Sequence, residues 1–377
     1  MTVELVSHLP KDSVSGIGRY VKELHKHLQD QIDIKITQGV DPPLSVRFPI
    51  LHNFPISVKD HLPGSIVHFM QIMGCAQMLW RPYHPSVATV HDLGALELPE
   101  EWQMLDPIAR QVLRLSLAGL NRVDLIVAVS EFSRNGVIKH LACWPERVVT
   151  IHQGIDYDTF RPIPNARESL LHHYSDLQKH ANAPWLLYVG SELPRKNVRT
   201  LLEAMTFLRQ KMPNIRLIKV GSAGGDQFRQ ETMRSVKELG LDDYIYFFDD
   251  VPEDELPGFY SAADLFITAS KLEGFGFPVL EAMACGVPVV CSTAGSLPEI
   301  AGEAAKLIHP NDTQGFVEAI FTLLRNSSLA DQMIQLGFQN AQKFNWRKTA
   351  ERTAMVYDTL LSGSPISSSK PEPLSTP

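Results

Sequence analysis

Two glutamates stand eight positions apart around a glycine turn in the stretch EGFGFPVLEAMACGVPVV, from Glu273 to Val290. Apolar residues on both sides of the turn indicate a buried parallel sheet, where an acid is costly unless a polar group meets it. At this separation one carboxylate could accept hydrogen bonds from a ribose and the other from a sugar. The structural alternative is that Glu281 complements a helix dipole while Glu273 is a solvated loop acid.

The glycine turn leads into a predicted helix whose start suits an anion. Pro278 fits the first helical turn, where its missing N–H costs nothing, and Gly286 ends the helix. Free backbone N–H groups and the helix dipole would form a site for a diphosphate, which the glycines allow to come close. The residues expected to line this site are Gly274, Phe275, Gly276, Phe277, Val279 and Leu280.

Two basic residues, Arg195 and Lys196, follow Gly190 at the end of the predicted strand in YVGSELPRKN. A diphosphate leaving group gains negative charge as the bond to it breaks. Fixed cations beside it stabilise the transition state more than the ground state. The pair is therefore a candidate clamp on such a group, and a solvated basic loop is the structural alternative.

Other candidate residues also follow predicted strands. His91 and Asp92, in VATVHDLG, stand at the carboxyl end of a strand, where open α/β sheets bind ligands. His91 is a candidate catalytic residue, whereas Asp92 could equally cap the loop that follows. FFDDVPEDEL ends another strand, where we expect a backbone contact with a ligand near Val251 and solvated acids.

The motif SGIGRYVKEL follows the first predicted strand and opens a helix, so the backbone at Gly16 and Gly18 can approach a ligand. A dinucleotide site would need a third glycine where Val21 stands, and the strand IDIKIT ends without the acid that holds an NAD ribose. These two departures argue against a dehydrogenase. A tight strand-to-helix turn without a ligand is the structural alternative for the glycines.

Short β-branched runs alternate with amphipathic helical stretches, which predicts an α/β protein with parallel sheets. The pattern stops near Phe160, and RPIPNARESLLHHYSDLQKHANAP is interpreted as a connector before the alternation restarts. Two Rossmann-like, doubly wound domains facing a cleft are therefore predicted. The predicted boundaries are 1–165 for the first domain, 166–345 for the second, 346–361 for a helix crossing back to the first domain, and 362–377 for a disordered tail.

Composition limits the class of protein. The 377 residues are 44% hydrophobic and 20% charged, and the net charge of −7 provides no overall basic field for nucleic acid. Four scattered cysteines are expected to be core thiols in a reducing compartment, and with no signal peptide visible a cytoplasmic location is predicted. Asp156 to Asp158 (DYD) is interpreted as a turn, and no histidine or cysteine spacing fits a metal, so no metal is predicted.

The stretch SKLEGFGFPVLEAMACGVPVVCSTAGSLPEIAG resembles the donor site of retaining GT-B glycosyltransferases. This large family, glycosyltransferase family four or glycosyl transferases group 1, includes sucrose and O-antigen mannosyl transferases. The motifs SGIGRY, VHDLG, VSEFSR, IHQGID and YVGSELPRKNVRTLLEAM stand in the expected order. The resemblance implies that Glu281 holds the ribose, that Glu273 contacts hydroxyls of the transferred sugar, and that His91 lies near its anomeric carbon.

The resemblance also implies roles on both sides of the cleft. Gly16 and Gly18 would face the donor phosphates or the acceptor. Many family members have an arginine directly after the strand glycine, where this sequence has Ser191. Some members carry adjacent Arg-Lys as here, which implies that Arg195 supplies the missing charge next to Lys196.

The implied activity is transfer of a hexose from a nucleotide diphosphate sugar to a hydroxyl of a saccharide or lipid-linked acceptor, without a cofactor or metal. Similarity to the O-antigen mannosyltransferase branch favours GDP-mannose, with a UDP-sugar as the alternative. An epimerase or phosphorylase of the same fold, or a binding protein without turnover, are the rivals. Peripheral contact with the inner membrane face through GRYVKELHKHLQDQ is left open, and no oligomeric state is predicted.

Overall fold

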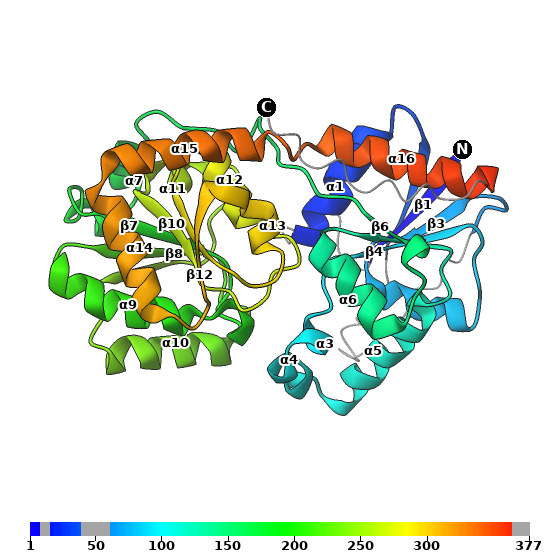
Figure 1. The fold of residues 1–377 in the computed structure, drawn as a ribbon, viewed down its shortest axis with the longest axis horizontal. Coiled ribbons are helices and arrows are strands. Elements are labelled where there is room, and N and C mark those ends of the chain that lie inside the picture. Colours follow the sequence, from blue (N-terminus) through cyan, green and yellow to red (C-terminus); the bar gives the residue numbers. More distant parts are fainter. Residues whose placement is uncertain (8–15, 39–60, 364–377) are drawn as a thin grey trace. The chain divides into compact units, whose positions relative to one another are not determined.

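The computed structural model describes residues 1–7, 16–38 and 61–363 (Figure 1). The predicted disordered tail, 362–377, lies outside these described residues from position 364 onwards.

The chain divides into two compact units. Unit 1 comprises Met1–Gly154 and Phe344–Pro377, and unit 2 comprises Ile155–Lys343. The first division therefore falls after Gly154, earlier than the predicted boundary at 165, and the C-terminal helix is part of unit 1.

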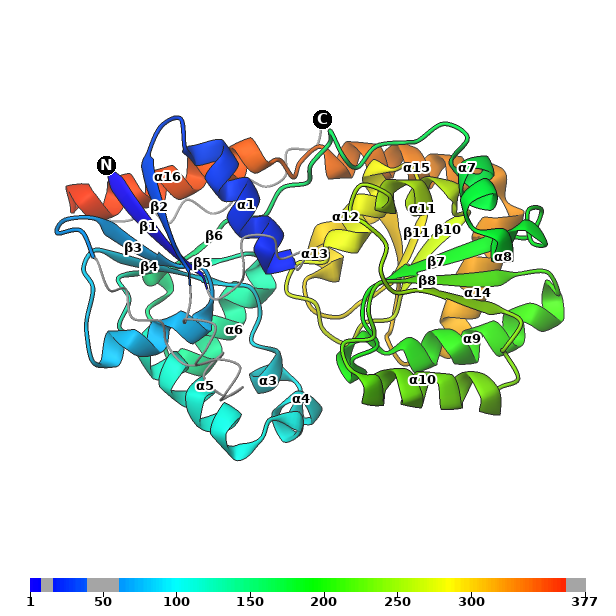
Figure 2. The same ribbon diagram turned by 180° about the vertical axis from the view of Figure 1, so that it is seen from behind.

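Unit 1 contains a six-stranded parallel sheet with the order β2-β1-β3-β4-β5-β6. Figure 2 shows α1 and α16 on one face of this sheet and α5 and α6 on the other. Its strands are β1 (Thr2–Ser7), β2 (Asp33–Gln38), β3 (Ile66–Phe69), β4 (Ser86–Val90), β5 (Leu125–Ala128) and β6 (Val148–Thr150). Its helices are α1 (Gly16–Leu28), η2 (Ile72–Leu79), α3 (Gly94–Glu97), α4 (Pro99–Met104), α5 (Pro107–Leu120), α6 (Glu131–Leu141), η3 (Pro145–Arg147) and α16 (Trp346–Ser362).

Unit 2 contains a second six-stranded parallel sheet, with the order β12-β11-β10-β7-β8-β9. Its strands are β7 (Trp185–Val189), β8 (Arg216–Val220), β9 (Ile245–Phe248), β10 (Leu265–Thr268), β11 (Val289–Ser292) and β12 (Ala305–Ile308). Its helices are α7 (Ala166–His173), α8 (Ser175–Gln178), η4 (Pro194–Lys196), α9 (Val198–Lys211), α10 (Asp226–Glu238), α11 (Leu256–Ala262), α12 (Phe277–Ala284), α13 (Leu297–Ala301), η5 (Gly302–Ala304), α14 (Thr313–Arg325) and α15 (Ser327–Ala341).

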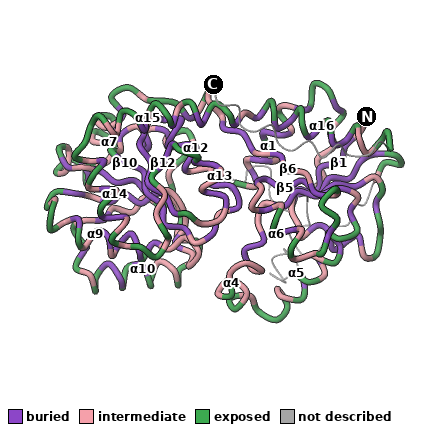
Figure 3. Tube along the Cα trace, in the orientation of Figure 1, coloured by how far each residue is buried: buried purple, intermediate pink, exposed green. Residues whose placement is uncertain are grey.

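The central strands are short, continuous apolar runs because helices cover both faces of each sheet, so no face is left for alternating polar residues. Every residue of β3, β4, β5, β10 and β11 is buried. Figure 3 shows the central strands as buried tubes, with the exposed positions on the outer sides of the helices and in the loops. Both predicted series of alternating strands and helices are observed, one in each unit. The predicted fold class, two Rossmann-like units, is confirmed.

The segment predicted as a connector after Phe160 contains two helices, α7 and α8. Leu170 and Leu177 are buried, and α7 packs against α11 of unit 2. The segment does connect β6 to β7, as interpreted, but it forms two helices that were not predicted.

Helix α16 completes unit 1. The side chain of Asn345 caps its first turn, and the helix packs along α1. Buried Tyr357 hydrogen-bonds through its hydroxyl to Nδ1 of His68 in β3 at 2.6 Å. At its start the fit is so close that a Cβ atom on Gly154 would lie 2.1 Å from the backbone nitrogen of Trp346.

Candidate active site

The order in which strands are added to the sheet of unit 2 reverses between β7 and β10. These strands are parallel neighbours, but the chain builds outward from β7 through β8 and β9 and from β10 through β11 and β12. In open α/β sheets, ligands bind at the carboxyl ends of the strands at such a switch point. The two loops that leave these ends, 190–197 and 269–276, are joined by a hydrogen bond from Lys271 N to Arg195 O at 2.7 Å.

Lys196 and Glu273 form an ion pair at this switch point. Lys196 Nζ lies 2.6 Å from Glu273 Oε1, and the two side chains are 14% and 13% exposed. Burial raises the pKa of Glu273, but Lys196, Arg195 and the Ser270 hydroxyl at 2.7 Å more than offset it, so the pKa is lowered. The two predicted site residues are therefore brought together, and neither is a solvated loop residue.

The backbone of Glu273 is held as closely as its side chain. Ser296 donates to the Glu273 carbonyl through both its N–H and its hydroxyl, each at 3.0 Å. Gly295, with φ +62°, lies against the same peptide, where an added Cβ would sit 2.5 Å from the Glu273 oxygen. A side chain at 295 would displace the loop, so this glycine is required for the position of the carboxylate.

The second glutamate is buried and has a hydrogen-bond partner within unit 2. Glu281 lies in α12 and is 2% exposed, and it accepts a hydrogen bond from the Tyr260 hydroxyl at 2.7 Å. Helix α12 begins after Gly276, which has φ +97°. The Val279 N–H donates to the Gly276 carbonyl at 3.1 Å, so this predicted free donor has a partner within the turn.

The other residues predicted around the turn are described as follows. Gly274 is buried, and the Phe275 and Phe277 rings meet edge to face with centroids 5.2 Å apart. The Leu280 side chain is fully buried in the core. Gly190 directly follows β7, and its N–H donates to the Val220 carbonyl at 2.9 Å.

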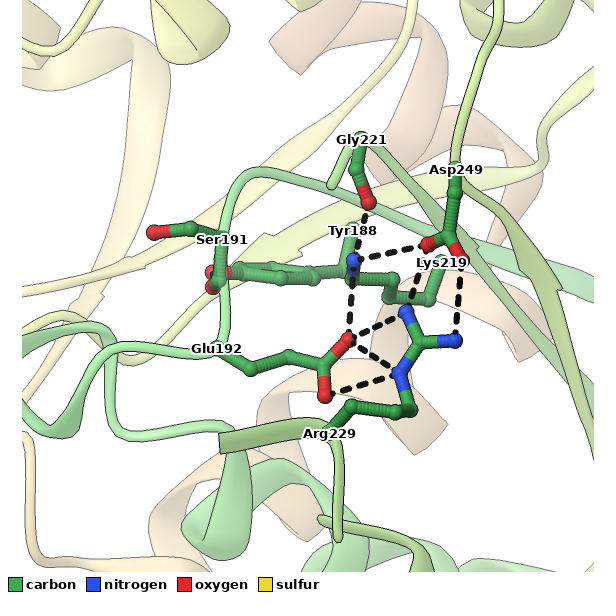
Figure 4. A network of polar contacts seen from close by, with 7 residues as sticks. All are labelled: Tyr188, Ser191, Glu192, Lys219, Gly221, Arg229 and Asp249. Atoms are coloured by element: carbon green, nitrogen blue, oxygen red, sulfur yellow. Dashed lines mark hydrogen bonds and ion pairs between the residues drawn. The ribbon is translucent and has the colours of Figure 1, made fainter. Parts of the chain in front are cut away.

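A charge quartet, Glu192, Lys219, Arg229 and Asp249, lies at the carboxyl ends of β7, β8 and β9 (Figure 4). In the figure the Arg229 guanidinium lies between the two carboxylates. These contacts were not predicted. The acids after β9 were expected to be solvated, and Asp249 is 43% exposed, but it is also paired with Arg229; Val251, two residues later, is half-buried. A lysine within the apolar run IRLIKV was the signal that could have revealed the quartet.

In unit 1, His91 follows β4 and both of its ring nitrogens are engaged. Nε2 donates to the Met70 carbonyl at 3.1 Å, so the neutral ring has a lone pair at Nδ1, which accepts from Gln153 Nε2 at 3.1 Å. Burial lowers the pKa of His91 to about 4, only partly offset by the Met70 bond and by Asp92. His91 is held as a neutral imidazole, and Gln153 had not been predicted to contact it.

The other predicted motifs in the first half of the chain form turns or caps within their own segments. Gly16 and Gly18 lie in the first turn of α1, and the residues just before them lie outside the described residues. Asp92 accepts from the Gly94 N–H at 3.0 Å and so caps its loop. Asp156 accepts from the Asp158 N–H at 3.0 Å, as the predicted turn requires.

Among the residues that the structure describes, no group of three or more His, Cys, Asp or Glu side chains could hold a metal ion. The four cysteines are buried free thiols, as predicted. Within the described ranges, every helix is too short or too polar to cross a bilayer.

Comparison with known proteins identifies two family models. Residues 14–159 match Glycosyltransferase Family 4, and residues 174–340 match Glycosyl transferases group 1. O-antigen chain mannosyltransferase B of Escherichia coli is 32% identical over 93% of this chain and 97% of its own length. A GDP-mannose-dependent alpha-(1-6)-phosphatidylinositol monomannoside mannosyltransferase of Mycolicibacterium smegmatis is 30% identical over 70% of this chain and 67% of its own.

The fold also matches solved structures. Anabaena HepE, crystallised with UDP-glucose, superposes with a TM-score of 0.76 over 95% of this chain and 100% of its own, at 20% identity. One family model ends within five residues of the boundary between the units, the other lies wholly in unit 2, and the relative at 32% identity spans 93% of the chain. The chain therefore belongs to glycosyltransferase family 4, with a glycosyl transferases group 1 domain in unit 2, and it is a glycosyltransferase.

Proposed function

We propose that this enzyme transfers mannose from GDP-mannose to a hydroxyl of a saccharide or lipid-linked acceptor, with retention of the anomeric configuration. The observation that carries the proposal is the Lys196–Glu273 pair at the switch point of unit 2. It combines a cation for a diphosphate with a carboxylate for sugar hydroxyls in loops bonded to each other.

In the proposed donor complex, Lys196 and Arg195 face the diphosphate, and the start of α12 adds its dipole. Glu281 accepts hydrogen bonds from the ribose, and the backbone near Val251 contacts the base. Glu273 accepts from hydroxyls of the transferred sugar. The N–H groups around Phe277 and Leu280, and the glycines Gly274 and Gly276, are assigned to the same donor site.

In the proposed reaction, the bond between the anomeric carbon and the diphosphate oxygen breaks while a bond from the acceptor oxygen forms on the same face of the sugar. The acceptor proton passes to the departing diphosphate, so no enzyme carboxylate has to form a covalent intermediate. Negative charge grows on the diphosphate during this step, and the fixed cations stabilise it most in the transition state.

His91 is proposed to lie near the anomeric carbon as a neutral group. The carbon becomes positively charged as the leaving group departs, and an imidazolium beside it would oppose that charge. Both ring nitrogens of His91 have partners in unit 1, which is consistent with a role in shaping the site rather than in proton transfer.

The donor is the least constrained part of the proposal. GDP-mannose is favoured because the relatives at 32% and 30% identity are named as mannosyltransferases, the second of them as GDP-mannose-dependent. A UDP-sugar is the alternative, since HepE of the same fold was crystallised with UDP-glucose. The base contacts proposed near Val251 are to backbone groups, which the side-chain sequence does not specify.

A panel of nucleotide sugars tests the proposal. Release of nucleoside diphosphate should be fastest with GDP-mannose and should rise when an acceptor is added. An epimerase would change the sugar without an acceptor, and a binding protein would release nothing. In parallel, GDP should raise the melting temperature more than UDP does. Stabilisation by UDP alone would reverse the choice of donor.

A lipid-linked acceptor would make peripheral contact with a membrane useful, and α1 would then be the contacting element. Its polar side carries Lys22, His25 and Lys26. Flotation of the full chain with liposomes of anionic lipid tests this part separately. Absence of binding would restrict the acceptor to saccharides in solution.

A further inference from the structure

We infer that the charge quartet is a positioning device for the donor site, in which Arg229 fixes the loop carrying Arg195 and Lys196 against the loop that follows β9. The inference rests on the proposed function, which assigns the diphosphate to the first loop and the base to the second. The quartet residues do not contact the donor in this proposal. They determine where the contacting residues stand.

Arg229, in α10, bridges the two loops with its guanidinium. On one side it donates to Glu192 Oε1 at 2.7 Å and 3.0 Å and to Oε2 at 3.1 Å. On the other side it donates to Asp249 Oδ1 at 2.5 Å and Oδ2 at 3.0 Å. Both contacts use two nitrogens and two oxygens, an arrangement that fixes orientation as well as distance (Figure 4).

Lys219 supports the same carboxylates from β8. Its Nζ lies 2.9 Å from Glu192 Oε1 and 3.7 Å from Asp249 Oδ1, and it also donates to the Gly221 carbonyl. The Lys219 side chain is 1% exposed, and that of Glu192 is completely buried. Burial raises the pKa of Glu192, but Arg229 and Lys219 more than offset it, so this carboxyl is ionised at neutral pH.

Four charges that sum to zero are not needed for the stability of unit 2. Apolar side chains of similar volume often stabilise a protein as well as a buried ion pair does, or better. Apolar packing, however, does not hold two loops at a fixed distance and angle, whereas bidentate arginine–carboxylate contacts do. The quartet is therefore better explained by orientation of the loops than by stability alone.

The path from Glu192 to Lys196 is short and fixed at several points. The Glu192 N–H donates to the Ala223 carbonyl at 2.9 Å, and the Tyr188 hydroxyl donates to the Ser191 carbonyl at 2.6 Å. At the far end, Asn197 donates through its side-chain amide to the carbonyls of Ala269 at 3.0 Å and of Pro310 at 2.7 Å. Because Glu192 is one of these fixed points and stands only a few residues before Lys196, we expect its loss to shift the basic pair.

The contacts of Arg229 form two arms, one to Glu192 and one to Asp249. The Asp249 arm leads to the loop proposed to contact the base. Asp249 is the first residue after β9, and Val251 follows two positions later. The Asp249 side chain is 43% exposed, in contrast to buried Glu192, so solvent weakens this arm more than the other. Removing Asp249 should consequently loosen the base loop while leaving the loop of Lys196 in place.

The test is a double-mutant cycle on the full chain, with kcat and donor KM measured for wild type, Arg229→Met, Lys196→Ala and the double variant. Lys196→Ala is expected to lower kcat about 10²-fold in the wild type. In the Arg229→Met background its effect should fall below about tenfold, because the lysine is no longer aligned. Equal effects in both backgrounds, within about twofold, would overturn the inference.

The matched control is Arg167→Met, which removes another arginine of unit 2. Arg167 donates to Asp264 Oδ2 at 2.6 Å and to the Ala262 carbonyl at 2.8 Å, at the amino ends of β7 and β10. This variant can lower the melting temperature, but the full effect of Lys196→Ala should persist in it. If the effect of Lys196→Ala shrinks in the Arg167→Met background as well, general loosening of unit 2, not the quartet, is responsible.

Asp249→Asn provides a second test if Arg229→Met does not fold. It should weaken GDP or UDP binding, measured by calorimetry, while pyrophosphate binding stays within about twofold of wild type. Equal losses for both ligands, or none for either, would overturn the assignment of the two arms. If the wild type binds no nucleoside diphosphate, the proposed function itself fails. If it binds and only the cycle is additive, the quartet inference alone fails.

Discussion

Lys196→Met tests whether the ion pair between Lys196 and Glu273 is shielded from water in the folded protein. The variant keeps a side chain of similar length but removes the ammonium 2.6 Å from the Glu273 carboxylate. Removing one partner of a buried pair costs about 3–5 kcal/mol. Arg195 and the Ser270 hydroxyl still face the carboxylate, so we expect the low end, about 3 kcal/mol at pH 7.

The pH dependence follows from the sign of the pKa shift. In the wild type the pKa of Glu273 is lowered from 4.5, so its contribution to stability is present above that value and is lost as the pH falls through the folded-state pKa. In Lys196→Met, less positive charge opposes the effect of burial on Glu273, so the pKa of Glu273 rises. Protonation then relieves the unpaired charge, so the destabilisation should be greatest at pH 7 and shrink towards pH 4.5.

The assay is urea unfolding of the full chain followed by circular dichroism at several pH values, with Glu273→Gln and the double variant Lys196→Met/Glu273→Gln as companions. The double variant has no unpaired carboxylate and should recover most of the stability that Lys196→Met loses at pH 7. An equal penalty at every pH, or a double variant no more stable than Lys196→Met, would show that the pair is solvated in the protein.

Three other predictions concern separate parts of the molecule. Glu281→Gln should leave the fold intact but weaken nucleoside diphosphate binding about tenfold or more, because a ribose hydroxyl loses a charged acceptor; unchanged affinity in calorimetry would exclude the ribose role. Gln153→Glu should raise the pKa of His91 and lower kcat on the acid side of a pH profile, and a profile identical to that of the wild type would contradict a role for the neutral ring. Glu4→Gln should destabilise the protein by about 1–3 kcal/mol at pH 7, since three hydrogen bonds to one carboxylate oxygen outweigh burial and lower the pKa of Glu4. The stability that ionised Glu4 contributes is present above the ordinary pKa of a glutamate and is lost as the pH falls. The difference in melting temperature between Glu4→Gln and the wild type should therefore narrow in acid, and a difference that stays constant with pH would contradict this role of Glu4.

The two sheets could be predicted because parallel strands covered on both faces are continuous β-branched runs, a pattern that local sequence shows directly. VPVVCS and DLIVAVS contain β11 and β5 for this reason. The positions of Glu273 and Lys196 at strand ends were predictable in the same way. Their ion pair was not, because the two residues are 77 positions apart and meet only when β7 and β10 become neighbours.

The charge quartet and the Gln153–His91 contact could not be predicted for the same physical reason. Each joins loops from strands whose order in the sheet is not encoded in any local pattern. Lys219 was a partial exception, since a lysine inside an apolar strand demands a buried partner. Its partner, Glu192, lies in a loop where an acid is ordinarily solvated, so sequence alone did not connect the two.

The membership of α16 in unit 1 has a consequence for the order in which the protein is made. The ribosome synthesises β1 to β6 first, then all of unit 2, and only then the helix whose Tyr357 hydroxyl reaches His68 in β3. Domains generally fold as they emerge during synthesis, so unit 2 can become native before unit 1 is complete. Until then, His68 lacks its Tyr357 partner and α1 lacks the helix that packs along it, so the first unit waits for the last described segment of the chain.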